Sequence, residues 1–365
     1  MRLMGNKVTI RDTISPSVNS IAAPLVSTNV GTQFGLFSFS YNQQYSALSS
    51  ELTAKRIEYQ THVDEQLAID PNFKGYRNNG VSLAWEYEKA DILMGGTGSE
   101  NFTPEQRAEI LERGRVRGFE GHHIKNVANN KVHQANPDNI KFYGSREDHV
   151  EIGHNGDVNN PSDGEFIDRD RMIRDTNRRR VITNEMKGLG ISAAIGFGVG
   201  VTISVIMELS RTGLQDANIP LLLKRSLISG VETAGISSIT YIVGRCASYA
   251  LENVFHLTPL AVTNVLSVGA ISSSIAVVYQ IAKMKIMGMS QDEIYDVVGK
   301  QATVSMLSVA LTSLATGLYG GVGGIVASIG FTVIYLGYNI GINIHNRALN
   351  DKLRAYTVEQ YRPVI

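Results

Sequence analysis

The sequence has almost no cysteine and no standard export signal. Its 365 residues contain a single cysteine, Cys246, which excludes an intramolecular disulfide and any metal site built from several thiolates. The N-terminal segment MRLMGNKVTIRD lacks the apolar run of a secretory signal peptide. We therefore expect a protein of the cytoplasm, or one that a dedicated secretion system exports.

A net charge is also lacking, because 34 lysines and arginines balance 34 aspartates and glutamates. Any basic surface for nucleic acid must therefore be local. The glycine-rich segment Gly95–Gly98 has neither a preceding strand nor a following Lys-Ser or Lys-Thr pair, which excludes a nucleotide-binding loop. The length predicts two or three domains.

Histidine is scarce, and its distribution is uneven. Of 8 histidines, five lie between residues 118 and 164: His122, His123, His133, His149 and His154. The first two are adjacent, and neighbouring side chains on a strand point to opposite faces. One of them can therefore bind a metal while the other reaches a substrate.

The residues around these histidines predict a strand, a loop, a second strand and a short helix. A Pro-Asp turn precedes Asn139, which opens the strand-like run 140–143. Ser145 is placed to cap a helix that carries His149, and Gly153 is placed to end it. The pattern therefore brings imidazoles from the first strand and the helix together.

This set of side chains suits phosphodiester hydrolysis. Three neutral imidazoles are typical ligands of a divalent transition metal and leave coordination positions open. A fourth imidazole beside the metal can deprotonate water near neutral pH. A metal and a positioned base together stabilise the charge that develops on a phosphate.

The stretch resembles an HNH endonuclease with a ββα-metal core, in the variant whose first motif reads Gly-His-His, as found in bacterial polymorphic toxins. The matching pieces are Gly121-His122-His123, Asn136-Pro137-Asp138-Asn139-Ile140, Glu147-Asp148-His149, Gly153-His154-Asn155-Gly156 and Asn160-Pro161-Ser162-Asp163-Gly164. The resemblance implies that His123 is the general base and that Asn139 orients it. The implied ligands of one divalent ion (Mg, Mn, Ni or Zn) are His122, His149 and His154.

The sequence departs from the colicin-type pattern at one point. In that pattern the last two histidine ligands lie four residues apart on one helix face, whereas His149 and His154 lie five apart. A left-handed turn at Gly153 would bring the second of them back to the metal.

The implied activity is hydrolysis of double-stranded DNA with little sequence preference, because no separate base-reading module is evident. A bacterial toxin or defence effector with an immunity protein as partner is the implied biology. Candidate contacts to DNA phosphates are Arg115, Arg117, Lys125 and Lys141. For the two arginines, a simple charge cluster at a helix end is an equally weighted alternative.

Residues 1–80 form a segment of unknown role with one helix at 49–69, and Gly35–Tyr41 and Val8–Ile10 are candidate strands. The composition of Pro71–Gly80 indicates a linker.

The nuclease domain is placed at 81–165. It opens with a helix over 81–94, and a capping box at Thr103-Pro104-Glu105-Gln106 begins a second helix that should end at Gly114.

An arginine-rich linker occupies 166–187. A solvated helix, an extension of the DNA-binding surface and a positive flank that keeps a following membrane helix's N-terminus in the cytoplasm all remain open. The arginines concerned are Arg169, Arg171, Arg174, Arg178, Arg179 and Arg180.

The hydrophobic multi-helix domain is placed at 188–346, with a solvated tail at 347–365. Gly188–Leu209 is long enough to cross a bilayer, and its regularly spaced small residues allow close helix contact, including contact between copies of the chain. Similar apolar runs follow at 258–282, 302–318 and 320–344, with a less uniform run at 220–243 and a polar loop or short surface helix at 291–299.

The predicted fold class is an α+β ββα-metal nuclease core with a helical lead-in, followed by a mostly α-helical hydrophobic domain that associates with the bacterial inner membrane or with an apolar partner. One alternative is a membrane-disrupting, pore-forming protein in which the histidine cluster is a structural metal site. Another is a soluble interaction protein whose apolar helices bury against partner copies.

Overall fold

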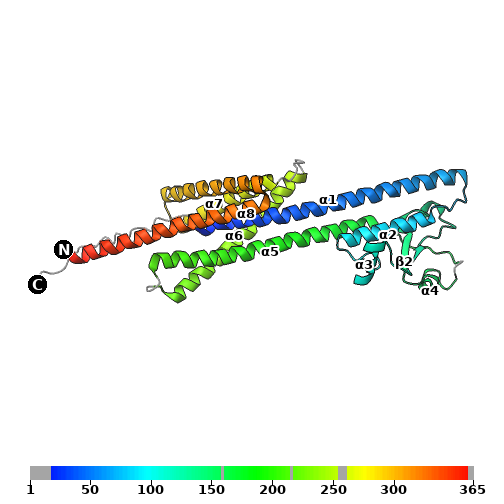
Figure 1. Cartoon of the computed structure of the whole chain (residues 1–365), viewed down its shortest axis with the longest axis horizontal. Coiled ribbons are helices and arrows are strands. Elements are labelled where there is room, and N and C mark those ends of the chain that lie inside the picture. Colours follow the sequence, from blue (N-terminus) through cyan, green and yellow to red (C-terminus); the bar gives the residue numbers. More distant parts are fainter. Residues whose placement is uncertain (1–17, 158–159, 214–216, 254–260, 361–365) are drawn as a thin grey trace. The chain divides into compact units, whose positions relative to one another are not determined.

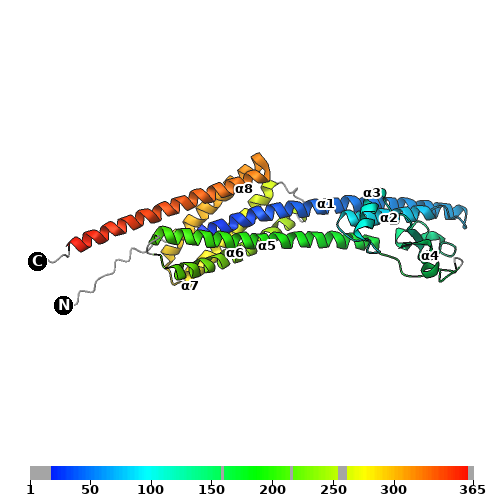
Figure 2. The same cartoon turned by 60° about the horizontal axis from the view of Figure 1, so that its bottom comes forward.

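The computed structural model describes residues 18–157, 160–213, 217–253 and 261–360 (Figures 1 and 2). The chain forms two compact units. The first, here the motif unit, is residues 38–184, and the second, the helical unit, combines residues 1–37 with 185–365. Helices α1 (Val18–Ile69) and α5 (Arg169–Thr212) each contribute to both units.

Helix α1 replaces one predicted strand. The whole of Gly35–Tyr41 is helical, so the strand prediction there is wrong, and the candidate strand at Val8–Ile10 lies outside the described residues. The segment is helical because its small residues, and not its aromatic ones, form the buried face. Thr32, Gly35 and Ser38 are buried at intervals of three, which is a helical period, whereas Phe37 is exposed.

In the motif unit, α2 (Arg77–Leu93) packs against the C-terminal half of α1 through a buried apolar cluster that includes Leu52, Leu83 and Tyr87 (Figure 2). The helix begins inside the predicted linker, whose last four residues are helical. Its Trp85 ring stacks on Phe142 at a centroid distance of 3.8 Å. This aromatic core fixes the two-stranded sheet against α2.

Helix α3 (Pro104–Arg113) forms as its flanking residues predict. Thr103 accepts a hydrogen bond from the backbone of Gln106, whose side chain bonds back to Thr103, and Gly114 ends the helix in the left-handed region at φ 78°. Strand β1 (Glu120–His123) then pairs antiparallel with β2 (Ile140–Tyr143).

A short α4 (Arg146–Asp148) follows β2 and passes directly into a π-helical turn, His149–Gly153. The Ser145 side chain caps α4 by accepting from the backbone N–H of Asp148. The predicted order of strand, loop, strand and helix is therefore confirmed, with short 3-10 turns at Lys131–His133 and Pro137–Asn139 inside the loop.

The first residue of α5 belongs to the core of the motif unit. Arg169 is fully buried, and its guanidinium forms an ion pair with the equally buried Glu88 at 2.8 Å. It also donates to the Pro137 carbonyl at 2.9 Å and lies over the Phe142 ring. This arginine is thus a core residue and cannot serve as a solvated, DNA-binding or membrane-flanking charge.

In the helical unit, α6 (Ile219–Asn253) packs on α7 (Ala261–Ile286), and α7 packs on α8 (Gln291–Gln360), as seen in Figure 1. The predicted loop or short helix at 291–299 and the separate runs at 302–318 and 320–344 are all parts of α8. The runs join because glycine weakens a helix by only about 1 kcal/mol per residue, whereas proline, absent from this segment, would break it.

The helical unit buries hydroxyl groups and exposes apolar side chains. Fully buried examples are Ser192, Thr233, Ser237, Thr240 and Ser248. Exposed examples are Ile191, Phe197, Leu223, Ile239 and Leu314. In the described residues, three helical segments are long and apolar enough to cross a membrane: Arg169–Thr212, Ile219–Ala250 and Gln291–Thr316.

Candidate metal centre

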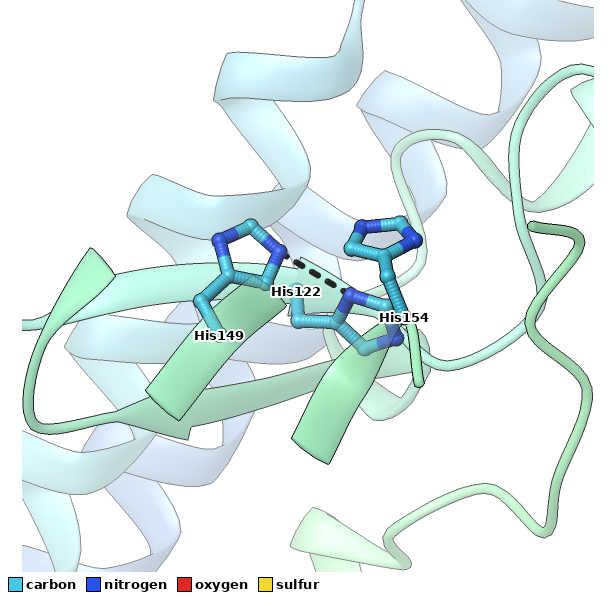
Figure 3. A group of neighbouring side chains, drawn as sticks. All are labelled: His122, His149 and His154. Atoms are coloured by element: carbon cyan, nitrogen blue, oxygen red, sulfur yellow. Dashed lines mark hydrogen bonds between the residues drawn. The ribbon is translucent and has the colours of Figure 1, made fainter. Parts of the chain in front are cut away.

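Three imidazoles converge beside the small sheet (Figure 3). His122 comes from β1, whereas His149 begins the π-helical turn and His154 follows it. One nitrogen from each ring can be chosen so that all three lie within 4.8 Å of one another. His122 Nδ1 and His149 Nε2 are 3.1 Å apart. The structure therefore brings together the three residues predicted as metal ligands.

The π-helical turn explains how ligands five residues apart can meet. In an α-helix, residues five apart differ in direction by about 140°. A π-helical turn holds more residues per turn, so positions five apart return to nearly the same face. His149 and His154 sit at the two ends of such a turn.

The predicted left-handed turn at Gly153 is wrong. The left-handed residues nearby are Asn155, at φ 49°, and Gly156, at φ 83°. Gly153 is needed for space instead, because a Cβ there would lie 3.2 Å from His122 Nδ1, from His149 Cδ2 and from Tyr143 Cε2.

Glu120 fixes the tautomer of His149. Its Oε2 lies 2.7 Å from His149 Nδ1, and its Oε1 lies 3.5 Å from Arg146 Nη1. The hydrogen bond with His149 lowers the pKa of the Glu120 carboxyl. Since a carboxylate can only accept, His149 Nδ1 carries the hydrogen and Nε2 keeps its lone pair for a metal.

His154 is oriented in the same way by the segment that follows it. Its Nδ1 lies 3.3 Å from the Asn160 carbonyl oxygen, while the Asn160 side chain donates to the His154 carbonyl at 3.0 Å. The carbonyl accepts a hydrogen from Nδ1, so His154 Nε2 also keeps its lone pair.

His122 is held in its neutral form. Burial, together with the nearby charges of His154 and His149, lowers its pKa to about 4. A neutral imidazole is the form that binds a metal. Three imidazoles whose nitrogens converge, two of them with Nε2 freed by a hydrogen bond at Nδ1, therefore fit a divalent ion, and the missing side chain at Gly153 leaves room for the rings.

His123 lies on the other face of β1 and has a different environment. Its Nε2 is 3.0 Å from the carbonyl oxygen of Gln134. Burial lowers the pKa of His123, the Gln134 carbonyl partly offsets this, and the positive charge of Arg77 lowers it again. The imidazole is therefore neutral at pH 7 and able to accept a proton.

Asn139 is fully buried and braces the loop between the strands. Its Oδ1 accepts from the Lys125 N–H at 2.7 Å, and its Nδ2 donates to the carbonyls of Lys125 and His133 at 3.0 and 3.2 Å. These hydrogen bonds close the loop that ends at Gln134. These hydrogen bonds of the Asn139 side chain reach the loop backbone and not the His123 imidazole.

The residues predicted to contact DNA lie on three segments. Lys141 is directly opposite His122 in the sheet. Lys125 Nζ is 3.6 Å from Asp163 Oδ1 and lies over the Phe166 ring. The exposed Arg115 and Arg117 lie between α3 and β1. Lys141 is therefore the one placed beside a metal-ligand candidate.

Two residues near His123 could not be predicted from the sequence. Gln134 lies in the predicted loop, and nothing in the sequence around it signals that its carbonyl faces His123. Arg77 lies in the predicted linker, where composition hides the start of α2. Ser162, in the segment 160–164 that carries part of the resemblance, also contacts His123. Its Oγ donates to the His123 carbonyl at 2.9 Å.

Comparison with known proteins gives one match. Residues 73–143 match the family described as the GHH signature containing HNH/Endo VII superfamily nuclease toxin. The matched segment includes His122, His123 and Asn139, whereas His149 and His154 follow it. No curated protein and no solved structure matches significantly. The predicted resemblance is confirmed, and residues 73–143 carry the signature of the GHH-type HNH/Endo VII nuclease toxins.

Proposed function

We propose that this protein is a metal-dependent endonuclease toxin that hydrolyses DNA phosphodiester bonds with low sequence specificity. One observation carries the proposal. Three imidazoles converge with their nitrogens close enough to share one ion, while the adjacent His123 is held apart from them on the Gln134 carbonyl. A purely structural metal site gives no reason for this separate, neutral fourth imidazole.

His123 has the tautomer of a general base. Because the Gln134 carbonyl can only accept, His123 Nε2 carries the hydrogen and Nδ1 keeps the lone pair. In the proposed step, Nδ1 takes a proton from water as the water oxygen bonds to phosphorus and the bond from phosphorus to the 3′ oxygen breaks. The resulting imidazolium stays hydrogen-bonded to Gln134.

His122, His149 and His154 hold the divalent ion in this proposal. When bound, the ion supplies positive charge to the phosphate and to the departing oxygen. Among the four candidates, an all-imidazole set favours Ni²⁺ or Zn²⁺ over Mg²⁺, which prefers oxygen ligands.

Lys125, Lys141, Arg115 and Arg117 are the proposed DNA contacts. Cations that bind backbone phosphates position the duplex without reading its sequence, which supports low specificity. Lys141 faces the same side of the sheet as His122, next to the proposed position of the cleaved phosphate.

Plasmid cleavage by the full chain tests this proposal. The protein in detergent is incubated with supercoiled DNA and Mg²⁺, Mn²⁺, Ni²⁺ or Zn²⁺, with and without EDTA. We expect nicking that EDTA abolishes and that is lost in His123→Ala but kept in His62→Ala, a control at an exposed position on α1. A folded protein that binds the ion but never cuts would reject the nuclease proposal.

We also propose that residues 188–346 insert into the bacterial inner membrane and tether or deliver the nuclease. The exposed apolar side chains and buried hydroxyl groups of the helical unit suit a lipid environment. Two of its ion pairs join different helices, Glu232 with Lys283 at 2.6 Å and Glu185 with Arg245 at 3.0 Å. Extraction from membranes by detergent, and not by carbonate or salt, is the expected result.

Three partners or activities extend this proposal. An immunity protein would protect the producing cell, and the glycine-rich helices would allow a homo-oligomer. The buried hydroxyl groups of the helical unit also favour pore formation as the second candidate activity. Dye leakage from liposomes caused by the His123→Ala protein would support a pore, because that activity needs no nuclease.

A further inference from the structure

Gln134 is a fully buried residue whose side-chain amide is saturated with hydrogen bonds. Its Nε2 donates to the carbonyls of Phe73 and Lys131 at 3.1 and 3.0 Å. Its Oε1 accepts from the backbone N–H of Tyr76 at 3.0 Å, at the start of α2. One side chain thus joins the loop between the strands to the segment that leads into α2.

The backbone of the same residue faces His123, whose Nε2 is 3.0 Å from the Gln134 carbonyl oxygen. Helix α2 approaches this carbonyl closely at Gly80, where a Cβ would lie 2.6 Å from the oxygen. The position of the carbonyl is therefore set by the amide anchors on one side and by the bare backbone of Gly80 on the other.

We propose that Gln134 is a positioning residue for His123, and this inference rests on the proposed nuclease function. The amide locks the loop onto residues 73–76, and the locked carbonyl holds the imidazole with Nδ1 directed to water. A carboxylate at position 134 would place an acceptor against two carbonyl oxygens and release the anchor. A displacement of about 1 Å in a reacting group costs about 10²-fold in rate.

Gln134→Glu tests this in the full chain, with Gln106→Glu as the matched control. Gln106 accepts from the Thr103 N–H in the capping box, a role that a glutamate fills equally well. We expect Gln134→Glu to lower kcat for plasmid nicking about 10²-fold. KM and the affinity for Zn²⁺ alone, measured by calorimetry, should stay at wild-type values, and the control should change none of these.

Gly80→Ala should disturb the same carbonyl from the side of α2. It provides a second test in case Gln134→Glu does not fold. Alanine favours the helix but pushes against the Gln134 oxygen. Its control is Gly299→Ala, at an exposed helical glycine with open space around it. A second readout needs no cutting. Diethyl pyrocarbonate should modify His123 severalfold faster in Gln134→Glu and Gly80→Ala than in the wild type, as mass spectrometry of the peptide will show.

The outcomes separate this inference from the nuclease proposal. Wild-type nicking and unchanged His123 reactivity in both variants would overturn the positioning role. So would a loss of Zn²⁺ affinity as large as the loss of kcat, because the whole site would then have collapsed. If the wild type does not cut, the nuclease proposal fails, and His123 reactivity alone decides the role of Gln134.

Discussion

Glu120 Oε2 lies 2.7 Å from His149 Nδ1, so a strand carboxylate orients a histidine that is 29 residues away in the sequence. The contact directs His149 Nε2 toward His122 Nδ1, 3.1 Å away. A carboxylate in this position also makes the imidazole a stronger metal ligand. The strength of metal binding should therefore depend on a residue that does not touch the metal.

Replacing Glu120 with Gln should weaken metal binding by about 10- to 100-fold, because the neutral amide no longer fixes the His149 tautomer. Calorimetric titration with Ni²⁺ or Zn²⁺ measures the change. The matched control is Glu147→Gln, at an exposed position on α4, which should bind as the wild type does. Equal affinity in both variants would show that Glu120 is an ordinary strand residue.

Gly153→Ala should also impair metal binding, for a steric reason. The new Cβ would lie 3.2 Å from His122 Nδ1 and from His149 Cδ2, so one ring must move away. We expect about a 10-fold loss of Zn²⁺ affinity or more, as found when the shell around a metal site is disturbed. Gly144→Ala is the control, since the nearest atoms there lie at ordinary contact distances of 3.7 Å or more. Unaltered affinity in Gly153→Ala would contradict the role given to this glycine.

The metal-free motif unit should lose stability in acid because of His122. Burial and the neighbouring charges lower the pKa of its imidazole to about 4, from 6.5 in the unfolded chain. Between these values the unfolded state binds more protons, so stability falls as pH falls from 6.5 toward 4. At pH 5, His122 should lower the free energy of unfolding by about 2 kcal/mol relative to neutral pH.

Urea unfolding in EDTA at pH 7 and pH 5, followed by the fluorescence of the single tryptophan Trp85, measures this change. Trp85 is buried in the core of the motif unit and therefore reports on that unit. His122→Gln should remove much of the pH dependence. An unchanged slope in that variant would assign the acid sensitivity to other groups.

Arg169→Met should destabilise the motif unit strongly, because it leaves the buried Glu88 without its cation. Breaking one side of a buried ion pair costs about 3–5 kcal/mol. Arg171→Met is the control, since its pairing with Asp175 is exposed and contributes less than about 1 kcal/mol. Trp85 fluorescence during urea unfolding again gives the measurement, and equal stability of the two variants would contradict the structural role of Arg169.

The ion pair between Arg169 and Glu88 also predicts which fragment of the chain folds on its own. A fragment that ends at residue 165 lacks Arg169 and should not unfold cooperatively, whereas residues 38–184 contain the whole unit. Circular dichroism during heating distinguishes the two fragments. A cooperative transition in the shorter fragment would show that α5 is dispensable for folding.

The residues of the site and their local structure were predictable from the amino-acid sequence. The Gly-His-His motif, Asn139 and the order of strand, loop, strand and helix could be read directly, because a Ser145 cap and a Pro-Asp turn act within a few residues. The capping box of α3 and its glycine end are local for the same reason. Apolar composition likewise indicated the helical unit, although not that its last runs form one continuous α8.

The way in which these residues come together depends on long-range packing. The π-helical turn that compensates for the five-residue spacing depends on packing around Gly153, where three side chains converge. Gln134 is anchored on Phe73, 61 residues away, and Arg169 on Glu88, 81 residues away. Such contacts leave no periodic or local signal, because their energy comes from desolvated partners that the fold alone brings together.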